Sequence, residues 1–113
     1  GGETRHLIDE TVLGAMQPHA HLINIARGDV VQEAALIEAL QAGRIGGAGL
    51  DVYEFEPKVP QALRDLSNTV LLPHVGSATV ETRAAMGALT VDNLLQHLKD
   101  GTVITPVPEC AHL

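Results

Sequence analysis

The chain has 113 residues, of which 45% are hydrophobic, and its only aromatic residues are Tyr53 and Phe55. This length suits one small domain with an aliphatic core. The formal net charge is −7 with scattered Lys and Arg, so we expect no nucleic-acid partner and no membrane partner, because both favour a basic face. Cys110 is the single cysteine, which excludes an internal disulfide. With no apolar run of transmembrane length and no signal pattern, a cytoplasmic location is expected.

The first half of the chain predicts a helix, a strand and a second helix. Asp9 is suited to cap a short helix that ends before Pro18. The apolar run 21–26 predicts a buried strand. Residues 33–42 are rich in Ala, Leu and Glu, and Gly43 stands where a helix C-cap belongs, so this segment predicts the second helix.

The second half predicts two further strands and a long helix. The strands cover 47–52 and 69–72, with a proline-containing loop and a short segment at 62–66 between them. A long helix is predicted over 79–99, capped by its first residue, because apolar residues recur there at spacings of four and three. The tail 105–108 contains two prolines and is predicted to be extended, without helix.

Strands that alternate with helices predict an α/β fold with a parallel sheet and right-handed crossovers. Three strands are few for a parallel sheet, which is normally buried on both faces. We therefore expect an incomplete domain, the second half of a larger parallel sheet. Strand 21–26 would then be an edge that exposes Leu22, Ile23 and Ile25, which favours pairing into a homodimer or aggregation.

Two short motifs could indicate a binding site, and each has to be compared with an alternative interpretation. The stretch Gly46-Gly47-Ala48-Gly49 has the glycines of a phosphate-binding loop. It precedes a strand instead of following one, so tight packing of a helix against a strand is the preferred interpretation. His19 and His21 are spaced as metal ligands could be, but no third ligand with suitable spacing follows. No metal site is predicted.

Three polar residues stand at the ends of apolar stretches, namely Arg27, Glu56 and His74. Strands of an open α/β sheet present the residues after their carboxyl ends to the crevice where ligands bind. A cation, a carboxylate and an imidazole brought together there would form an anion-binding acid–base site, and the alternative is three unrelated surface residues at loop starts. Gly28 is predicted to supply the permissive backbone with which the chain leaves its strand.

Four motifs stand in order along the chain: Asn24-Ile25-Ala26-Arg27-Gly28-Asp29-Val30-Val31, Ala35-Leu36-Ile37-Glu38-Ala39-Leu40, Gly47-Ala48-Gly49-Leu50-Asp51-Val52-Tyr53-Glu54-Phe55-Glu56-Pro57 and Leu72-Pro73-His74-Val75-Gly76-Ser77-Ala78-Thr79. Together they resemble the D-isomer-specific 2-hydroxyacid dehydrogenases. The similarity covers nearly the whole chain, from Glu3 to about Pro106. The stretches Phe55-Glu56-Pro57 and His74-Val75-Gly76-Ser77 are most similar to the glyoxylate/hydroxypyruvate reductases of that family.

The resemblance implies a role for each of the three polar residues. Arg27 would hold the carboxylate and carbonyl oxygen of a small 2-keto acid with its planar fork of donors. His74 would donate a proton to the carbonyl oxygen as hydride arrives from the nicotinamide, and would take it back in the oxidation of the 2-hydroxy acid. Glu56 would pair with His74 and stabilise the imidazolium.

The resemblance also implies a cofactor, NAD or NADP, of which this chain would hold the nicotinamide end. Asp51 would accept a hydrogen bond from the nicotinamide carboxamide. Two segments would line the rest of this site. They are the backbone around Ile25, Ala26 and Arg27 and the loop of His74, Val75, Gly76 and Ser77.

The chain departs from the family in what it lacks. The Gly-x-Gly-x-x-Gly turn that binds the pyrophosphate, the residue that selects the ribose and the separate substrate domain are missing. We therefore expect a C-terminal fragment, inactive by itself. Residues 1–78 would be the C-terminal half of the NAD(P)-binding domain, an incomplete domain formed by the second half of a Rossmann-type doubly wound parallel sheet with three strands and their helices. Residues 79–113 would be a long helix and tail that return toward the substrate domain.

Two other functions stay open at this point. The first is a non-catalytic dinucleotide-sensing or scaffolding protein on the same fold, and the second is a stand-alone α/β module that has lost its activity. The intact set of Arg27, Glu56 and His74 favours the enzyme, whereas the missing glycine turn favours lost activity for this chain alone.

Overall fold

The computed structural model describes residues 2–113 and divides the chain into two compact units. The first unit ends at Gly76, and the second runs from Ser77 to Leu113. This division lies two residues before the boundary predicted after residue 78. The first unit contains the sheet and all of the predicted site residues except Ser77, and the second contains the long helix and the tail.

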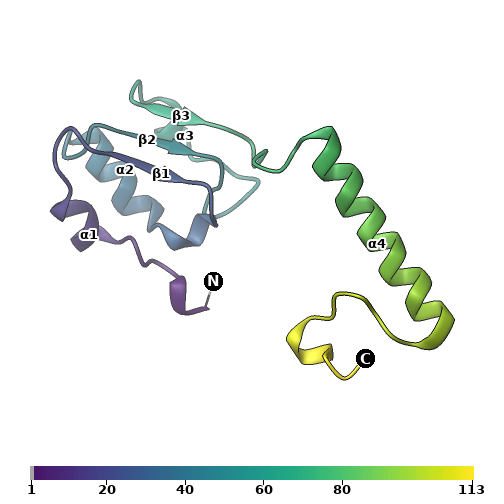
Figure 1. Cartoon of the computed structure of the whole chain (residues 1–113). Helices are drawn as coiled ribbons and strands as arrows, with labels where there is room; N and C mark the ends of the chain where they lie inside the picture. The colour runs from purple at the N-terminus through teal and green to yellow at the C-terminus, as the bar shows by residue number, and fades with distance from the viewer. Residues whose placement is uncertain (1) are drawn as a thin grey trace. The chain divides into compact units, whose positions relative to one another are not determined.

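The first unit is built on a three-stranded parallel sheet of β1 (His21–Asn24), β2 (Gly47–Leu50) and β3 (Thr69–Leu71), in the order β1-β2-β3 (Figure 1). The predicted parallel α/β fold is confirmed. Each strand ends one or two residues earlier than predicted. Beyond the end of β1, the backbone N–H of Ala26 donates to Asn24 Oδ1 instead of to a neighbouring strand. Beyond β2 and β3 a single backbone hydrogen bond to the neighbouring strand follows, from Asp51 to Asn24 and from Leu72 to Leu50.

The predicted helices of this unit are confirmed, with small shifts at their ends. Asp9 caps the first of them, since its Oδ1 accepts from the backbone N–H of Val12 at 3.1 Å. Gly43 follows the second with a φ of +69°, the left-handed conformation that a helix end favours. The elements are α1 (Glu10–Ala15), α2 (Glu33–Gln41) and α3 (Gln61–Arg64), with short 3₁₀ turns η1 (Gly2–Thr4) and η2 (Gly28–Val30).

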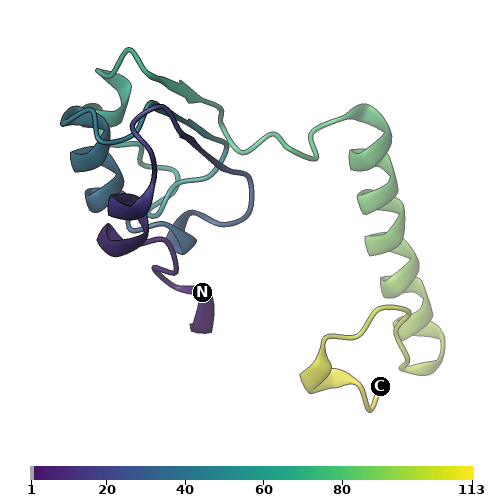
Figure 2. The same cartoon turned by 60° about the vertical axis from the view of Figure 1, so that its left-hand side comes forward.

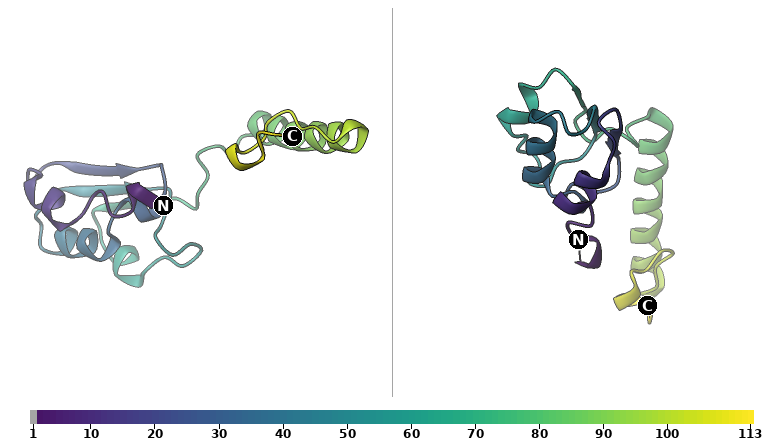
Figure 3. Two further views of the ribbon diagram at one scale, coloured as in Figure 1. Left: turned by 90° about the horizontal axis from the view of Figure 1, so that it is seen from below. Right: turned by 90° about the vertical axis from the view of Figure 1, so that its left-hand side faces the viewer.

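The helices of the first unit lie on one side of its sheet (Figure 3, left). The core lies between these helices and the sheet. It consists of aliphatic side chains and one tyrosine: Leu13, Val31, Leu36, Ala39, Leu40, Ile45, Ala48, Leu50, Tyr53 and Leu63. Alternate residues of a strand point to opposite faces of its sheet. The other face accordingly carries Ile23 and Val70, each 65% exposed, on either side of Gly49.

Strand β1 is an edge of this sheet, as predicted. Ile23 and Ile25 are exposed there, the latter at 75%. Leu22 differs from the prediction, because it points to the helical side and packs against the core. Within β1 the exposed residue is therefore Ile23, while Ile25 is exposed just beyond the end of the strand.

The glycines of β2 lie against the neighbouring strand and a loop. The prediction that they allow a helix to pack tightly against a strand is therefore wrong. A Cβ at Gly49 would stand 2.9 Å from Cδ1 of Ile23 on β1. A Cβ at Gly47 would stand 2.7 Å from the carbonyl oxygen of Asn68. Small residues are needed on β2 because side chains and backbone from its neighbours fill the space beside it.

The second unit is a long helix, α4 (Val80–Asp100), with a tail that folds back along it (Figure 2). Thr79 caps the helix by accepting from the backbone N–H of Thr82 at 3.1 Å, and Gly101 ends it with a φ of +80°. The side chain of Asn93 then holds the tail, since its Oδ1 accepts from the backbone N–H groups of residues 104 and 105. The predicted cap and length of the helix are confirmed.

The tail departs from the prediction at one point. It was predicted to be extended over 105–108, but a 3₁₀ turn, η3 (Pro108–Cys110), begins at its last residue. Proline is compatible with the first position of a helical turn, because the backbone N–H that it lacks would have no partner there. Across residues 2–113, none of the helices combines the length and the apolar character needed to cross a bilayer.

Candidate active site

The segment after β1 is shaped by Asn24, which is 6% exposed. Its Oδ1 accepts from the backbone N–H of Ala26 at 3.1 Å, and its Nδ2 donates to the carbonyl oxygen of Arg27 at 3.0 Å. A turn closed by an asparagine side chain in this way competes with further strand pairing. It fixes the point at which Arg27 leaves the sheet.

Gly28 brings this turn against the segment that follows β2. A Cβ at Gly28 would stand 1.9 Å from the carbonyl oxygen of Tyr53 and 2.5 Å from the backbone nitrogen of Glu54. The φ of Gly28 is not in the left-handed region, so the predicted reason for this glycine, a permissive backbone, is wrong. Glycine is required here because two backbone segments approach each other too closely for any side chain.

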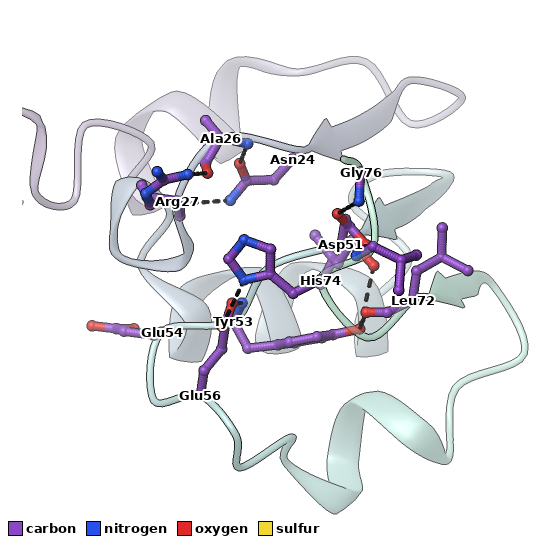
Figure 4. Close-up of polar contacts among 12 residues, drawn as sticks. Asn24, Ala26, Arg27, Asp51, Tyr53, Glu54, Glu56, Leu72, His74 and Gly76 are labelled. Carbon is purple, nitrogen blue, oxygen red and sulfur yellow. Dashed lines mark hydrogen bonds and ion pairs between the residues drawn. The ribbon is translucent and has the colours of Figure 1, made fainter. Parts of the chain in front are cut away.

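Glu56 and His74 form the hydrogen-bonded pair that the sequence predicted (Figure 4). His74 Nδ1 lies 2.8 Å from Glu56 Oε2, and Glu56 Oε1 accepts from the backbone N–H of Tyr53 at 3.0 Å. The hydrogen bond with His74 and then that from Tyr53 lower the pKa of the Glu56 carboxyl below its ordinary value. Glu56 is therefore an ionised partner for His74 at neutral pH, and Nε2 of His74 is the ring nitrogen that does not face it.

Two residues of the β2 end hold the backbone on either side of His74. Asp51, 5% exposed, accepts from the backbone N–H of Val75 at 2.8 Å with Oδ1 and from that of Gly76 at 2.9 Å with Oδ2. The Tyr53 hydroxyl donates to the carbonyl oxygen of Leu72 at 2.7 Å. Burial raises the pKa of this hydroxyl, which keeps it a neutral donor. The backbone from 72 to 76 is thus held at three points.

Arg27 lines the same hollow as Glu56 and His74. The hollow has a volume of about 460 Å³ and its walls include Arg5, Arg27, Glu56 and His74. Nη1 of Arg27 donates to the carbonyl oxygen of its neighbour Ala26 at 2.7 Å (Figure 4). A second hollow of about 390 Å³ lies beside Glu56 and His74 and is more apolar, lined also by Tyr53, Pro57, Val59 and Pro73. Glu56 and His74 line both hollows.

The other predicted cofactor residues are placed less directly. Ile25 is exposed, and Val75 and Gly76 are held by Asp51. Each oxygen of that aspartate already accepts one N–H and keeps a further lone pair for a ligand. Ser77 begins the second unit, and its role remains a prediction. Residues 2–113 contain no group of three or more His, Cys, Asp or Glu side chains suited to hold a metal ion.

A second polar cluster, which sequence analysis missed, anchors the N-terminal segment near the site. Glu33 and Glu54 exchange hydrogen bonds, each accepting at 3.1 Å from the backbone N–H of the other. His6 Nε2 lies 2.5 Å from Glu54 Oε1, and Arg5 lies 3.7 Å from the same oxygen. Burial raises the pKa of both carboxyls; for Glu54, the hydrogen bonds from His6 and from Glu33 outweigh it and leave the pKa below its ordinary value.

Some of these residues left a signal in the sequence. Asn24 is a polar residue inside an otherwise apolar run, which is typical of a side chain that closes a turn. Glu33 stands in the first turn of a predicted helix, where carboxylates are favoured. His6 had no such signal, because its partner Glu54 is 48 residues away.

Comparison with known proteins gives the site a family context. Residues 1–76 match the family model described as the NAD binding domain of D-isomer specific 2-hydroxyacid dehydrogenases. Hydroxyphenylpyruvate reductase of Plectranthus scutellarioides is 54% identical over 93% of this chain and 34% of its own length. Glyoxylate/hydroxypyruvate reductase A of Arabidopsis thaliana has the same identity and the same coverage.

A solved structure agrees in fold. The NADPH-dependent glyoxylate/hydroxypyruvate reductase of Sinorhizobium meliloti, crystallised with citrate, superimposes with a TM-score of 0.92 at 51% identity, over 97% of this chain and 35% of that one. The same enzyme has also been crystallised with NADP and malonate. The chain spans about a third of the length of these relatives.

The Glu56–His74 pair can be tested in the chain itself. Because the hydrogen bond with His74 is the main cause of the lowered pKa of Glu56, we expect His74→Ala to raise that pKa toward its ordinary value. The pair is present above the lowered pKa and is lost as the pH falls through it. Carbon-detected NMR titration of the Glu56 carboxyl measures this change, with His97→Ala as the matched control. An unchanged Glu56 titration in His74→Ala would show that the pair does not form in solution.

Proposed function

Since the chain belongs to the D-isomer specific 2-hydroxyacid dehydrogenase family, we propose that it carries the acid–base site of an NAD(P)-dependent oxidoreductase. The reaction is hydride transfer between NAD(P)H and a small 2-keto acid of the glyoxylate or hydroxypyruvate type, with the 2-hydroxy acid as product. One observation carries the proposal: the Glu56–His74 pair, 2.8 Å apart, lines one hollow together with Arg27. The proposal concerns the full-length enzyme, of which this chain is one part.

Each of the three residues has a distinct task in this reaction. The guanidinium of Arg27 binds the substrate carboxylate and orients the keto group, for which it exchanges its present bond to the Ala26 carbonyl oxygen. His74, bound to Glu56 through Nδ1, donates the proton on Nε2 to the carbonyl oxygen, and the alcohol forms without a free alkoxide. Glu56 remains ionised and stabilises the imidazolium before the transfer.

The nicotinamide supplies the hydride when the cofactor is bound. Within this chain we propose that Asp51 accepts from its carboxamide and that the remaining contacts come from Ile25, Ala26, Arg27 and the backbone of the loop His74, Val75, Gly76 and Ser77. The lone pairs left on the Asp51 oxygens support this role. A cytoplasmic location belongs to the same proposal.

Substitutions in the full-length enzyme test the assigned tasks. Arg27→Lys should raise KM for the keto acid and lower kcat, with kcat/KM reduced roughly 10²-fold, because a point charge cannot orient a carboxylate at two atoms.

Glu56→Gln should move the alkaline limb of the pH profile of the reduction to lower pH, because a neutral amide stabilises the imidazolium less than a carboxylate does. Steady-state oxidation of NAD(P)H with glyoxylate and hydroxypyruvate measures both.

His74→Ala provides the reference for these variants, with an expected loss of about 10²–10⁴-fold in kcat. An enzyme in which all three variants reduce keto acids like the parent across the pH range would contradict the proposal. A full-length protein that binds NAD(P)H tightly and reduces no keto acid would instead indicate the non-catalytic, dinucleotide-sensing alternative.

The 113-residue chain by itself is expected to bind NADH weakly and to catalyse no turnover. Its nicotinamide contacts are few and open to solvent, and are worth on the order of 1 kcal/mol each, too little to offset the cost of ordering the ligand. No Gly-x-Gly-x-x-Gly turn for the pyrophosphate occurs in the sequence. Calorimetric titration with NADH and an absorbance assay with glyoxylate measure the two properties. Micromolar binding, or turnover above the His74→Ala control, would contradict this expectation.

We further propose that the isolated chain forms homodimers or larger assemblies. Ile23 and Val70 are exposed on one face of the sheet, Ile25 is exposed just beyond the end of β1, and β1 presents an open edge. Apolar edge strands pair with other chains unless they are covered or charged. Light scattering at tens of micromolar should therefore give a mass above that of the monomer, and the double variant Ile23→Lys/Ile25→Lys should lower it. A monomer at that concentration would contradict the proposal.

A further inference from the structure

His74 has a backbone conformation that requires outside support. Its φ is +56°, in the left-handed region that residues other than glycine rarely adopt. A residue other than glycine keeps this strained conformation only where other contacts fix it. The hydrogen bond to Glu56 fixes the ring of His74, and the side chains of both residues are partly exposed. The backbone conformation therefore needs a separate cause.

Asp51 supplies the contacts that fix this turn. Both of its carboxylate oxygens are used, one for the backbone N–H of Val75 and one for that of Gly76, the two peptide groups that follow His74 (Figure 4). The two N–H groups converge on one buried anion, in the manner of an anion-binding nest. Gly76 fits closely, since a Cβ there would stand 3.2 Å from Asp51 Oδ2.

The location of Asp51 makes this support rigid. It directly follows β2, the central strand, and its own backbone N–H donates to the carbonyl oxygen of Asn24 at 3.1 Å. The same short segment carries Tyr53, whose backbone N–H holds Glu56. The acid–base pair is thus held from two ends by one segment: the carboxylate through Tyr53 and the imidazole through Asp51.

We infer that Asp51 is a positioning residue for His74, which holds the imidazole against Glu56 by binding the two backbone N–H groups that follow it. This inference rests on the proposed function only for the importance of His74 to the reaction. The role exists in the chain without any cofactor, and is separate from a contact between Asp51 and the nicotinamide.

The substitution Asp51→Asn tests this role in the 113-residue chain. The amide of asparagine has one acceptor oxygen, so its NH₂ group faces the second backbone N–H and one of the two bonds is lost. Hydrogen exchange at Val75 or Gly76 should accelerate about tenfold. The pKa of Glu56 should also rise toward its ordinary value, because His74 is no longer held beside it.

Asp9→Asn is the matched control. The side chain of Asp9 accepts from the backbone N–H of Val12, and asparagine caps a helix as well as aspartate does. The same chemical change there should leave the exchange of Val75 and Gly76 and the pKa of Glu56 as in the parent. A general loss of stability would instead accelerate exchange throughout the first unit, including the amides of β2.

A measurement on the parent chain keeps the inference testable if Asp51→Asn does not fold. In the parent, the amides of Val75 and Gly76 should exchange more than about tenfold slower than in an unstructured peptide. Exchange at the unstructured rate, or an Asp51→Asn variant with the parent's Glu56 pKa and amide protection, would overturn the inference. Neither NMR result depends on whether the full-length enzyme reduces keto acids, so failure of the proposed function would be seen separately in the kinetic assays.

Discussion

The structure of the site depends on one short segment, 51–56, and on the hydrogen bonds by which it holds the segment 72–76. Asp51 binds the two peptide groups after His74, the Tyr53 hydroxyl binds the carbonyl oxygen of Leu72, and Glu56 binds the imidazole. These contacts join the ends of two neighbouring strands. They allow the partly exposed Glu56–His74 pair to keep a defined geometry, because the groups that orient it are mostly buried.

Segment 51–56 also fixes the distance between Arg27 and the Glu56–His74 pair. Gly28 lies against the peptide between Tyr53 and Glu54 so closely that no side chain would fit. Asn24 holds the turn that leads to it. The end of β1 is therefore tied to the end of β2 by backbone contact, while the end of β2 is tied to the end of β3 by side-chain hydrogen bonds. Arg27, Glu56 and His74 line one hollow as a consequence.

Much of this arrangement could be predicted because it follows from local sequence. Helix caps such as Asp9 and Thr79 satisfy N–H groups three residues away, and strands show as short apolar runs. The convergence of Arg27, Glu56 and His74 follows from a general property of parallel sheets, whose carboxyl ends share one edge. The sequence therefore predicted the fold and the contact between Glu56 and His74, whereas the acid–base role of this pair stays a proposal.

The remaining features depend on contacts between distant residues. Asp51 binds peptide groups 24 and 25 positions away, and Glu33 and Glu54 exchange bonds across 21 positions. Gly28 looked like a conformational requirement, whereas the constraint is steric and comes from another strand end. Ile23 and Val70 lie on the exposed face of the sheet, whereas Leu22 does not. Which residues of a strand face the core depends on the register in which the strands pair, and this pairing joins distant parts of the chain.

In the proposed reaction, Arg27 and His74 bind one substrate molecule between them. A crystal structure of the full-length enzyme with NADH and oxamate, an unreactive analogue of a 2-keto acid, tests it most directly. We predict that the oxamate carboxylate contacts the guanidinium of Arg27 and that its amide carbonyl oxygen lies within hydrogen-bond distance of His74 Nε2, with Nδ1 still on Glu56. Oxamate bound away from Arg27, with Nε2 of His74 directed elsewhere, would contradict this account.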